Sequence, residues 1–226
     1  MSSDTRHSGA EQWARVDAYV EAHFTADDDS AALVLRRQRE AGLPDIAVSP
    51  AQGKLLEVLT LAVGARRVLE FGTLGGYSTL WFARAVGPGG TVVSFELERR
   101  HADGAMASLE EAGVGDRVEI RVGPAVDNLG TLAEDEPYDL VFIDADKPSN
   151  AAYYEAAMTQ VHPGTLVIVD NVVRDGALAD PDSTDERVVG SRAVVERVAA
   201  DPRVSGSVVQ TVGSKFYDGM IIATVL

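Results

Sequence analysis

The sequence predicts an α/β fold, namely a doubly wound, mostly parallel seven-stranded sheet with a C-terminal antiparallel hairpin and extra N-terminal helices. From residue 67 onwards, short runs of large apolar and β-branched residues alternate with segments of helical periodicity, which is typical of a parallel sheet covered on both faces. The 226 residues are 46% hydrophobic and contain no linker or internal repeat. We therefore expect one domain, residues 1–226, with a substantial core.

The first 60 residues are expected to form a helical layer that precedes the sheet. Helical spacing begins at Trp13, and a second helix is expected from Ser30 towards Glu40. Ser49 as cap and Pro50 as first residue open a third helix. The apolar stripe of the first helix consists of Trp13, Val16, Tyr19, Val20 and Phe24.

Residues 66–226 are expected to form the core, in which strands and helices alternate without interruption. The predicted strands are residues 68–72, 91–95 and 117–122, the apolar runs that begin at Tyr138 and Leu166, and residues 204–212 and 216–225. The predicted helical segments are residues 75–86, 97–111, 125–133, 150–160 and 186–199. A polar loop covers residues 174–186, and the last two strands are joined tightly enough to form a hairpin.

Polar side chains follow the two strands that begin at Tyr138 and Leu166. One run ends in Asp144, Asp146 and Lys147, and the other ends in Asp170 and Asn171. A single crossover helix fits between the runs, so the strands are predicted to be parallel neighbours whose ends share one edge of the sheet. Any one Asp at a strand end is more often a cap or turn former, but three beside a lysine favour a site for a hard divalent cation.

Composition excludes several classes of function. A net charge of −15 argues against a nucleic-acid partner, and the absence of cysteine excludes disulfides, a thiolate nucleophile and a thiolate zinc site. The four histidines have no ligand spacing, which favours surface or capping roles for them. No signal peptide and no apolar run of membrane-spanning length is present, so we expect a soluble cytoplasmic protein.

The first strand and turn of the core are the candidate cofactor site. Glycines at positions 72, 75 and 76 allow a sharp turn after Glu70, but their spacing is not that of a dinucleotide site. Glu70 would repel a pyrophosphate and suits a cationic ligand. Glu96 ends the second strand, where a carboxylate can accept hydrogen bonds from a ribose diol. Together these residues favour S-adenosylmethionine as the cofactor.

The chain resembles the cation-dependent O-methyltransferases, the group of the catechol and caffeoyl-CoA O-methyltransferases, which have a Rossmann-like fold. The resemblance covers residue 48 to the C-terminus. It rests on the segments Val68-Leu69-Glu70-Phe71-Gly72 through Gly76-Tyr77-Ser78, Phe142-Ile143-Asp144-Ala145-Asp146-Lys147, and Asp170-Asn171. The second and third segments, at their separation, are the most specific.

The resemblance implies roles for individual residues. It assigns Asp144, Asp170 and Asn171 to a divalent cation, with Mg²⁺ first and Ca²⁺ or Mn²⁺ as alternatives, and Lys147 with Asp144 to catalysis. It assigns these residues to S-adenosylmethionine: Val48, Glu70, Gly72, Ser78, Glu96, Ala125 and Asp144. Two departures from the family pattern stand out. Pro124 replaces the usual acidic residue before Ala125, and Arg174 puts a cation at the mouth where catechol methyltransferases are apolar.

The resemblance implies methyl transfer from S-adenosylmethionine to a hydroxyl of a catechol-like diphenol, with a homodimer as the assembly. A cation bound to both oxygens of the diol would acidify it, and Lys147 would take its proton. Lys147 could alternatively form a structural ion pair with Asp146. Two other functions stay open, a non-catalytic S-adenosylmethionine-binding dimer and a nicotinamide-dependent oxidoreductase. The acceptor, the methylated position and the cellular metal are not specified by the sequence.

Overall fold

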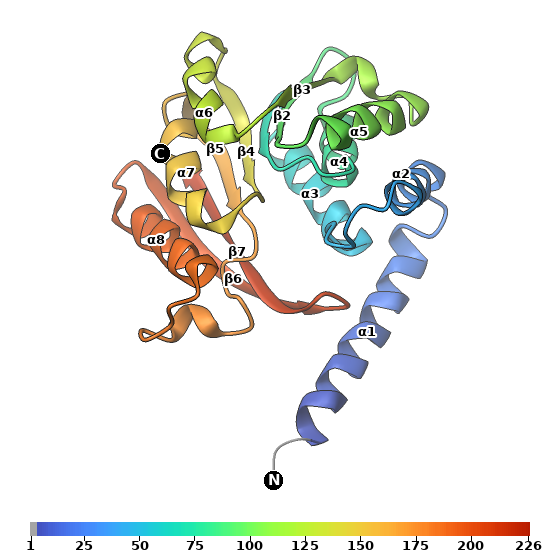
Figure 1. The fold of residues 1–226 in the computed structure, drawn as a ribbon, viewed down its shortest axis with the longest axis vertical. Helices are drawn as coiled ribbons and strands as arrows, with labels where there is room; N and C mark the ends of the chain where they lie inside the picture. The colour runs from blue at the N-terminus through green and yellow to red at the C-terminus, as the bar shows by residue number, and fades with distance from the viewer. Residues whose placement is uncertain (1–3) are drawn as a thin grey trace.

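The computed structural model describes residues 4–226, with side chains from Gly9 onwards, and has the predicted α/β architecture (Figure 1). One seven-stranded sheet has the order β3-β2-β1-β4-β5-β7-β6. The strands are β1 (Arg67–Phe71), β2 (Thr91–Glu96), β3 (Val118–Val122), β4 (Tyr138–Ile143), β5 (Val161–Val169), β6 (Val204–Gly213) and β7 (Phe216–Val225). The first five are parallel, and β7 is antiparallel to both β5 and β6. The predicted hairpin is therefore confirmed.

The α-helices alternate with the strands as expected. They are α1 (Asp4–Phe24), α2 (Asp29–Glu40), α3 (Pro50–Ala62), α4 (Tyr77–Val86), α5 (Arg99–Glu111), α6 (Ala125–Asn128), α7 (Asn150–Ala157) and α8 (Glu186–Ala200). Short 3₁₀ turns are η1 (Gly115–Arg117), η2 (Leu129–Glu134), η3 (Lys147–Ser149) and η4 (Ala177–Ala179). No helix in the described part of the chain is both long and apolar enough to cross a membrane.

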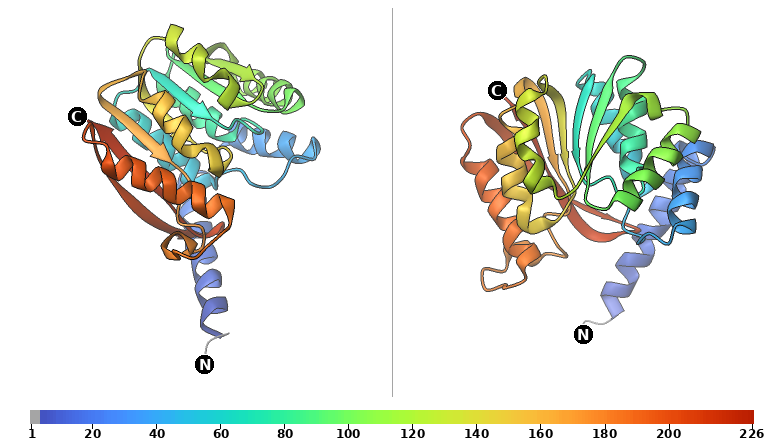
Figure 2. Two further views of the ribbon diagram at one scale, coloured as in Figure 1. Left: turned by 60° about the vertical axis from the view of Figure 1, so that its left-hand side comes forward. Right: turned by 45° about the horizontal axis from the view of Figure 1, so that its top comes forward.

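The sheet has one hydrophobic core on each face, because side chains alternate along the strands. In β1, Val68 packs with α2, α3 and α4 on one face, whereas Leu69 and Phe71 pack with α7 and α8 on the other. Figure 2 shows these two groups of helices on opposite sides of the sheet. The same alternation in β4 gives Leu140 and Val141 to opposite cores. Two-sided burial explains why the strands are continuously apolar in sequence.

The N-terminal helices are attached to the core by polar contacts. Ser49 caps α3 as predicted, with its Oγ accepting a hydrogen bond from the Gln52 N–H at 3.2 Å. Asp28 caps α2 and also binds the Arg84 guanidinium of α4 through both of its oxygens, at 2.5 and 2.6 Å. Helix α1 begins at Asp4, nine residues before the expected start at Trp13. Part of its apolar stripe is solvent-exposed, with Tyr19 67% exposed.

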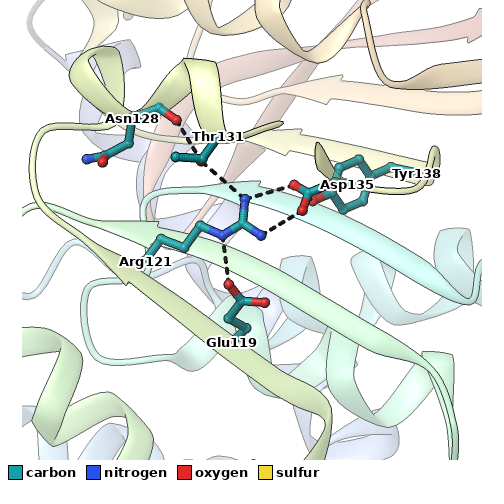
Figure 3. Close-up of polar contacts among 6 residues, drawn as sticks. All are labelled: Glu119, Arg121, Asn128, Thr131, Asp135 and Tyr138. Carbon is teal, nitrogen blue, oxygen red and sulfur yellow. Dashed lines mark hydrogen bonds and ion pairs between the residues drawn. The ribbon is translucent and has the colours of Figure 1, made fainter. Parts of the chain in front are cut away.

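An arginine on β3 fixes the segment between β3 and β4 (Figure 3). Arg121 binds the Asp135 carboxylate through both terminal nitrogens, at 2.7 and 2.8 Å, and binds Glu119 through Nε at 2.7 Å. It also donates a hydrogen bond to the Thr131 hydroxyl at 3.3 Å, and Tyr138 donates to the same Asp135 at 2.6 Å. These bonds tie η2 to β3 and so hold α6 beside the carboxyl end of β3.

Two glycines in helix interiors provide a matched test of packing between α3 and α4. A Cβ at Gly53 would overlap the buried Trp81 indole, whereas a Cβ at Gly104 has no atom within 4 Å. Both Ala variants gain about 1 kcal/mol of helix propensity. We nonetheless expect Gly53→Ala to destabilise the protein by about 1–3 kcal/mol, because the steric overlap with Trp81 costs more than the gain in helix propensity. Gly104→Ala should be neutral or stabilising. Urea denaturation midpoints of the two variants check this, and equal midpoints would contradict it.

Candidate active site

A cavity of about 820 Å³ lies at the carboxyl ends of the parallel strands. This is the edge at which ligands bind in open α/β sheets. Eight of the residues assigned to a site from sequence line the cavity, namely Val48, Gly72, Ser78, Glu96, Ala125, Asp144, Lys147 and Asn171. Glu70 and Asp170 do not line it and are buried behind its wall, with exposed fractions of 0% and 3%.

Gly72 allows the chain to pass close to the end of β4. Its φ of 102° lies in a region that favours glycine, and a Cβ at this position would overlap the backbone carbonyl oxygen of Asp144. The N–H of Gly72 donates to the Phe95 carbonyl oxygen at 3.0 Å, and the N–H of Asp144 donates to the Phe71 carbonyl oxygen at 2.9 Å. The turn after β1 is therefore fixed by both neighbouring strands.

Glu70 has a different position from the one expected from sequence. Its carboxylate accepts hydrogen bonds from three hydroxyls, those of Ser78 at 2.5 Å and of Thr79 and Ser94 at 2.6 Å. Burial raises the pKa of Glu70 to about 7, although the three donors oppose the shift. Glu70 does not line the cavity, and it holds the cavity-lining Ser78 in place. Contact between Glu70 and a cationic ligand stays a prediction from the sequence.

Glu96 reaches the cavity from the end of β2 and is held on three sides. Its Oε2 accepts a hydrogen bond from the Leu74 N–H at 2.8 Å, and its Oε1 accepts one from the Glu98 N–H at 3.0 Å. His101 Nδ1 lies 3.2 Å from the same Oε1. His101 thus supports the cavity-lining Glu96 from behind, whereas the sequence suggested a surface or capping role. His101 lies in the first turn of α5, and this closeness to the end of β2 was the sequence signal for its contact with Glu96.

Two carboxylates and a lysine meet where β4 and β5 end. Lys147 is 8% exposed, and its Nζ lies 2.7 Å from Asp144 Oδ1. Asp170 Oδ2 accepts a hydrogen bond from Gln52 Nε2 at 2.5 Å, and Oδ1 accepts one from the Asn171 N–H at 2.8 Å. Burial, and then the charge of Asp144, raise the pKa of Asp170 to about 7. Gln52 comes from α3, 118 residues away, and no sequence pattern pointed to it.

The alternative in which Lys147 forms an ion pair with Asp146 is contradicted by the structure. Asp146 accepts hydrogen bonds from the hydroxyls of Ser149 and Tyr153, each at 2.5 Å, while Lys147 pairs with Asp144. The turn that carries Lys147 is seated directly on α8, because a Cβ at Gly190 would overlap the Lys147 backbone carbonyl. The position of the lysine is therefore set by both its ion pair and its backbone packing.

The donor atoms at these strand ends suit a hard cation. Asp144 and Asp170 lie close enough for their charges to interact, and Asn171 lines the cavity, so two carboxylates and one side-chain amide can supply oxygen donors. No group of three or more His, Cys, Asp or Glu placed to hold a metal occurs among the residues described, because the third donor here is an amide. Burial, and then the charge of Asp144, raise the pKa of Asp170, and a bound divalent cation would offset both effects.

The cavity wall also contains Gln38 and Arg187, which the sequence did not single out, and Pro124 and Arg174, which it did. Gln38 lines the cavity with a buried Oε1 that has no hydrogen-bond partner in the described structure, and its Nε2 donates to the Pro44 carbonyl oxygen at 3.1 Å. A buried acceptor without a partner is suited to a bound ligand. Pro124 is the N-cap of α6 and lines the cavity without an N–H to offer. Arg174 and Arg187 line the opposite end.

Known proteins with this architecture are similar along nearly the whole chain. A family model described as O-methyltransferase matches residues 24–224. A catechol O-methyltransferase of Mycobacterium tuberculosis is 47% identical over 93% of this chain and 94% of its own length. A catechol O-methyltransferase of Niastella koreensis is 41% identical over 93% of this chain and 96% of its own.

Solved structures agree in fold and in sequence. The O-methyltransferase from Bacillus cereus in complex with SAH is 48% identical, with a TM-score of 0.93, and the match covers 96% of this chain and 100% of that one. The O-methyltransferase of Streptomyces achromogenes involved in tomaymycin synthesis, in complex with SAM, is 44% identical, with a TM-score of 0.91. That match covers 96% of this chain and 98% of the other.

The buried Glu70 gives a stability test that does not depend on a ligand. Its pKa rises from 4.5 to about 7 on folding, so the folded state binds more protons between these values and the free energy of unfolding falls as pH rises. Glu70→Gln removes this titration. We expect the free energy of unfolding of the variant, minus that of the parent, to increase by up to about 3 kcal/mol from pH 5 to pH 8.

Urea denaturation of both proteins at several pH values gives this difference. The contribution of Asp170, whose pKa is also about 7, is present in both proteins and cancels. A difference that stays constant with pH would show that Glu70 is ionised in the folded protein at pH 5.

Proposed function

Because the chain belongs to the O-methyltransferase family and is an S-adenosylmethionine-dependent O-methyltransferase, we propose that it methylates a hydroxyl of a catechol-like small molecule held beside a divalent cation. The observation that carries this proposal is the meeting of Asp144, Asp170 and Lys147 at neighbouring strand ends beside the cavity. The catechol O-methyltransferases of M. tuberculosis and N. koreensis, at 47% and 41% identity, support the choice of acceptor class.

In this proposal the cofactor occupies the part of the cavity formed by the ends of β1, β2 and β3. Glu96 would accept hydrogen bonds from the ribose, and Gly72, Ser78, Ala125 and the Val48 backbone would line the rest of its site. SAM and SAH complexes of relatives at 44% and 48% identity support a cofactor of this kind. The glycines after β1, at positions 72, 75 and 76, do not have the spacing of a dinucleotide site, so a nicotinamide dinucleotide fits the turn poorly.

The divalent cation would be held by Asp144, Asp170 and Asn171, with Mg²⁺ first among the candidates because all donors are oxygens. Such a cation supplies Lewis acidity that lowers the pKa of a phenolic hydroxyl. Hydrogen bonds within the chain position one of these ligands. The Gln52 amide and the Asn171 N–H orient the buried Asp170 carboxylate, at 2.5 and 2.8 Å.

The methyl transfer needs one proton acceptor and an aligned pair of reactants. In its neutral amine form, Lys147 takes the proton from the acceptor hydroxyl, and the oxygen then forms a bond to the methyl carbon while the carbon–sulfur bond breaks. The sulfonium becomes a thioether, and charge balances without a covalent enzyme intermediate. Packing of η3 on Gly190 and the 2.7 Å contact with Asp144 hold Lys147 in position for this step.

We further propose that the chain works as a homodimer. The apolar stripe on α1 supports this, since Val16, Tyr19 and Phe24 are 55%, 67% and 66% exposed. A second copy would cover this face. Light scattering at micromolar concentration measures the mass, and a monomer would refute the assembly without affecting the proposed chemistry.

Removing one carboxylate tests the cation. Asp170→Asn keeps the shape of the buried side chain and removes its charge, so we expect methyl transfer to a diphenol in Mg²⁺ to fall at least about 100-fold. The increase in the thermal unfolding midpoint that Mg²⁺ causes in the parent should also disappear. Asp103→Asn, at a site 67% exposed, is the control and should retain both. Parental activity in excess chelator would refute the cation requirement.

Removing the amine tests the proton acceptor. Lys147→Ala should lower kcat by about 10²–10⁴-fold at pH 7 with little change in the affinity for SAH. The loss should shrink as pH rises, because the acceptor then ionises without a base. Lys215→Ala, which removes a surface ion pair with Asp45, is the control. A near-parental kcat for Lys147→Ala would mean that the lysine has only a structural role.

A further inference from the structure

Three basic side chains line the cavity, and they differ in their partners. Lys147 is paired with Asp144, and Arg187 is paired with Asp185, each at 2.7 Å. Arg174 lies within 4.0 Å of no carboxylate oxygen and makes no side-chain hydrogen bond among the residues that the structure describes. Its guanidinium is therefore the cavity-lining cation whose charge is available to a ligand.

The backbone holds Arg174 in place without using its side chain. The Asp218 carboxylate on β7 accepts hydrogen bonds through Oδ1 from the N–H groups of Val173 and Arg174, both at 3.0 Å, and from that of Gly219 at 2.9 Å. Arg174 itself has a φ of 56°, a conformation that is costly for a residue with a side chain. Such strain persists only where surrounding contacts enforce it, and here it directs an arginine to the cavity.

The strand order separates Arg174 from the cofactor. The residues proposed for the nucleoside follow β1, β2 and β3, whereas Arg174 follows β5, and β4 lies between β1 and β5. Adjacent strands are about 4.8 Å apart, so the ends of β1 and β5 are separated by about 10 Å. Arg174 thus lies beside Asn171 and on the far side of Lys147 from the cofactor, where an acceptor would sit.

On the basis of the proposed function, we propose that the acceptor is a vicinal diphenol that also carries a carboxylate, and that the Arg174 guanidinium binds this carboxylate. A guanidinium presents two parallel N–H groups that match the two oxygens of a carboxylate. The chain has a net charge of −15, so an unpaired cation in its cavity offers a clear electrostatic preference for an anionic acceptor. Asp146 and Asp185 nearby disfavour a doubly charged phosphate.

A matched pair of acceptors tests this inference. We would measure kcat/KM for a vicinal dihydroxybenzoate and for the corresponding neutral dihydroxybenzamide, at saturating S-adenosylmethionine and Mg²⁺. The parent should prefer the acid. Arg174→Gln should lower the acid-to-amide ratio by about 10–100-fold, and Arg174→Lys should retain part of the preference because it keeps the charge but not the planar fork.

Arg187→Gln is the matched comparison, because that arginine lines the same end of the cavity but already has a carboxylate partner. It should change the ratio much less than Arg174→Gln does. An equal effect of the two variants, or an unchanged ratio in Arg174→Gln, would overturn the assignment. Calorimetry with SAH adds a further check, since a loss of SAH affinity in Arg174→Gln with an unchanged ratio would assign the arginine to the cofactor's carboxylate instead.

The same assay separates this inference from the proposed function. Methylation of both acceptors by the parent without discrimination would refute the carboxylate preference and leave catechol methylation intact. Absence of turnover with either acceptor would refute the proposed function itself.

Discussion

Parallel pairing of β4 with β5 brings two acidic side chains together, and the candidate site depends on this contact. Ile143 and Val169 are register partners, so the residues that follow them, Asp144 and Asp170, leave the sheet side by side. The N–H of Asp170 donates to the Ile143 carbonyl oxygen at 2.9 Å, which extends the pairing up to the carboxylates. Burial, and then the charge of Asp144, raise the pKa of Asp170. Lys147 is the basic group at this edge, with its Nζ 2.7 Å from Asp144 Oδ1.

The other contacts around the site reduce the freedom of the groups that meet there. Gln52 reaches Asp170 from the N-terminal helical layer, and Gly190 seats the Lys147 turn against α8. Gly72 allows the end of β1 to approach the end of β4 closely, and the Asp144 N–H donates a hydrogen bond to the Phe71 carbonyl oxygen there. The first two contacts join a helix on one face of the sheet to the strand ends, and the third joins two strand ends to each other. Such support from several elements is what a preorganised polar site needs.

The cavity is divided by charge as well as by position. The ends of β1 to β3 present the carboxylate of Glu96, which is held by backbone N–H groups. The β5 end has Arg174 and Arg187. A cationic cofactor and an anionic acceptor would thus each meet the opposite charge, in the order in which the strands deliver these residues.

The sequence by itself determined the order and type of the elements, the hairpin, and the residues that end each strand. These features are local, because apolar runs, cap residues such as Ser49 and carboxylates at strand ends all lie within a few residues of the element they define. Parallel neighbours then require Asp144 and Asp170 to share an edge. The chemistry that those residue types allow was therefore also predictable.

Only the tertiary structure decided how each polar group is used. Glu70 faces hydroxyls on α4 and β2 instead of the cavity, Lys147 pairs with Asp144 and not with Asp146, and Gln52 completes the surroundings of Asp170. The start of β5 at Val161 likewise depends on pairing with Tyr138 across a register irregularity. A buried polar group takes whichever partner the packing brings within hydrogen-bond distance. The partner depends on segments far apart in the chain, so local sequence patterns do not predict it.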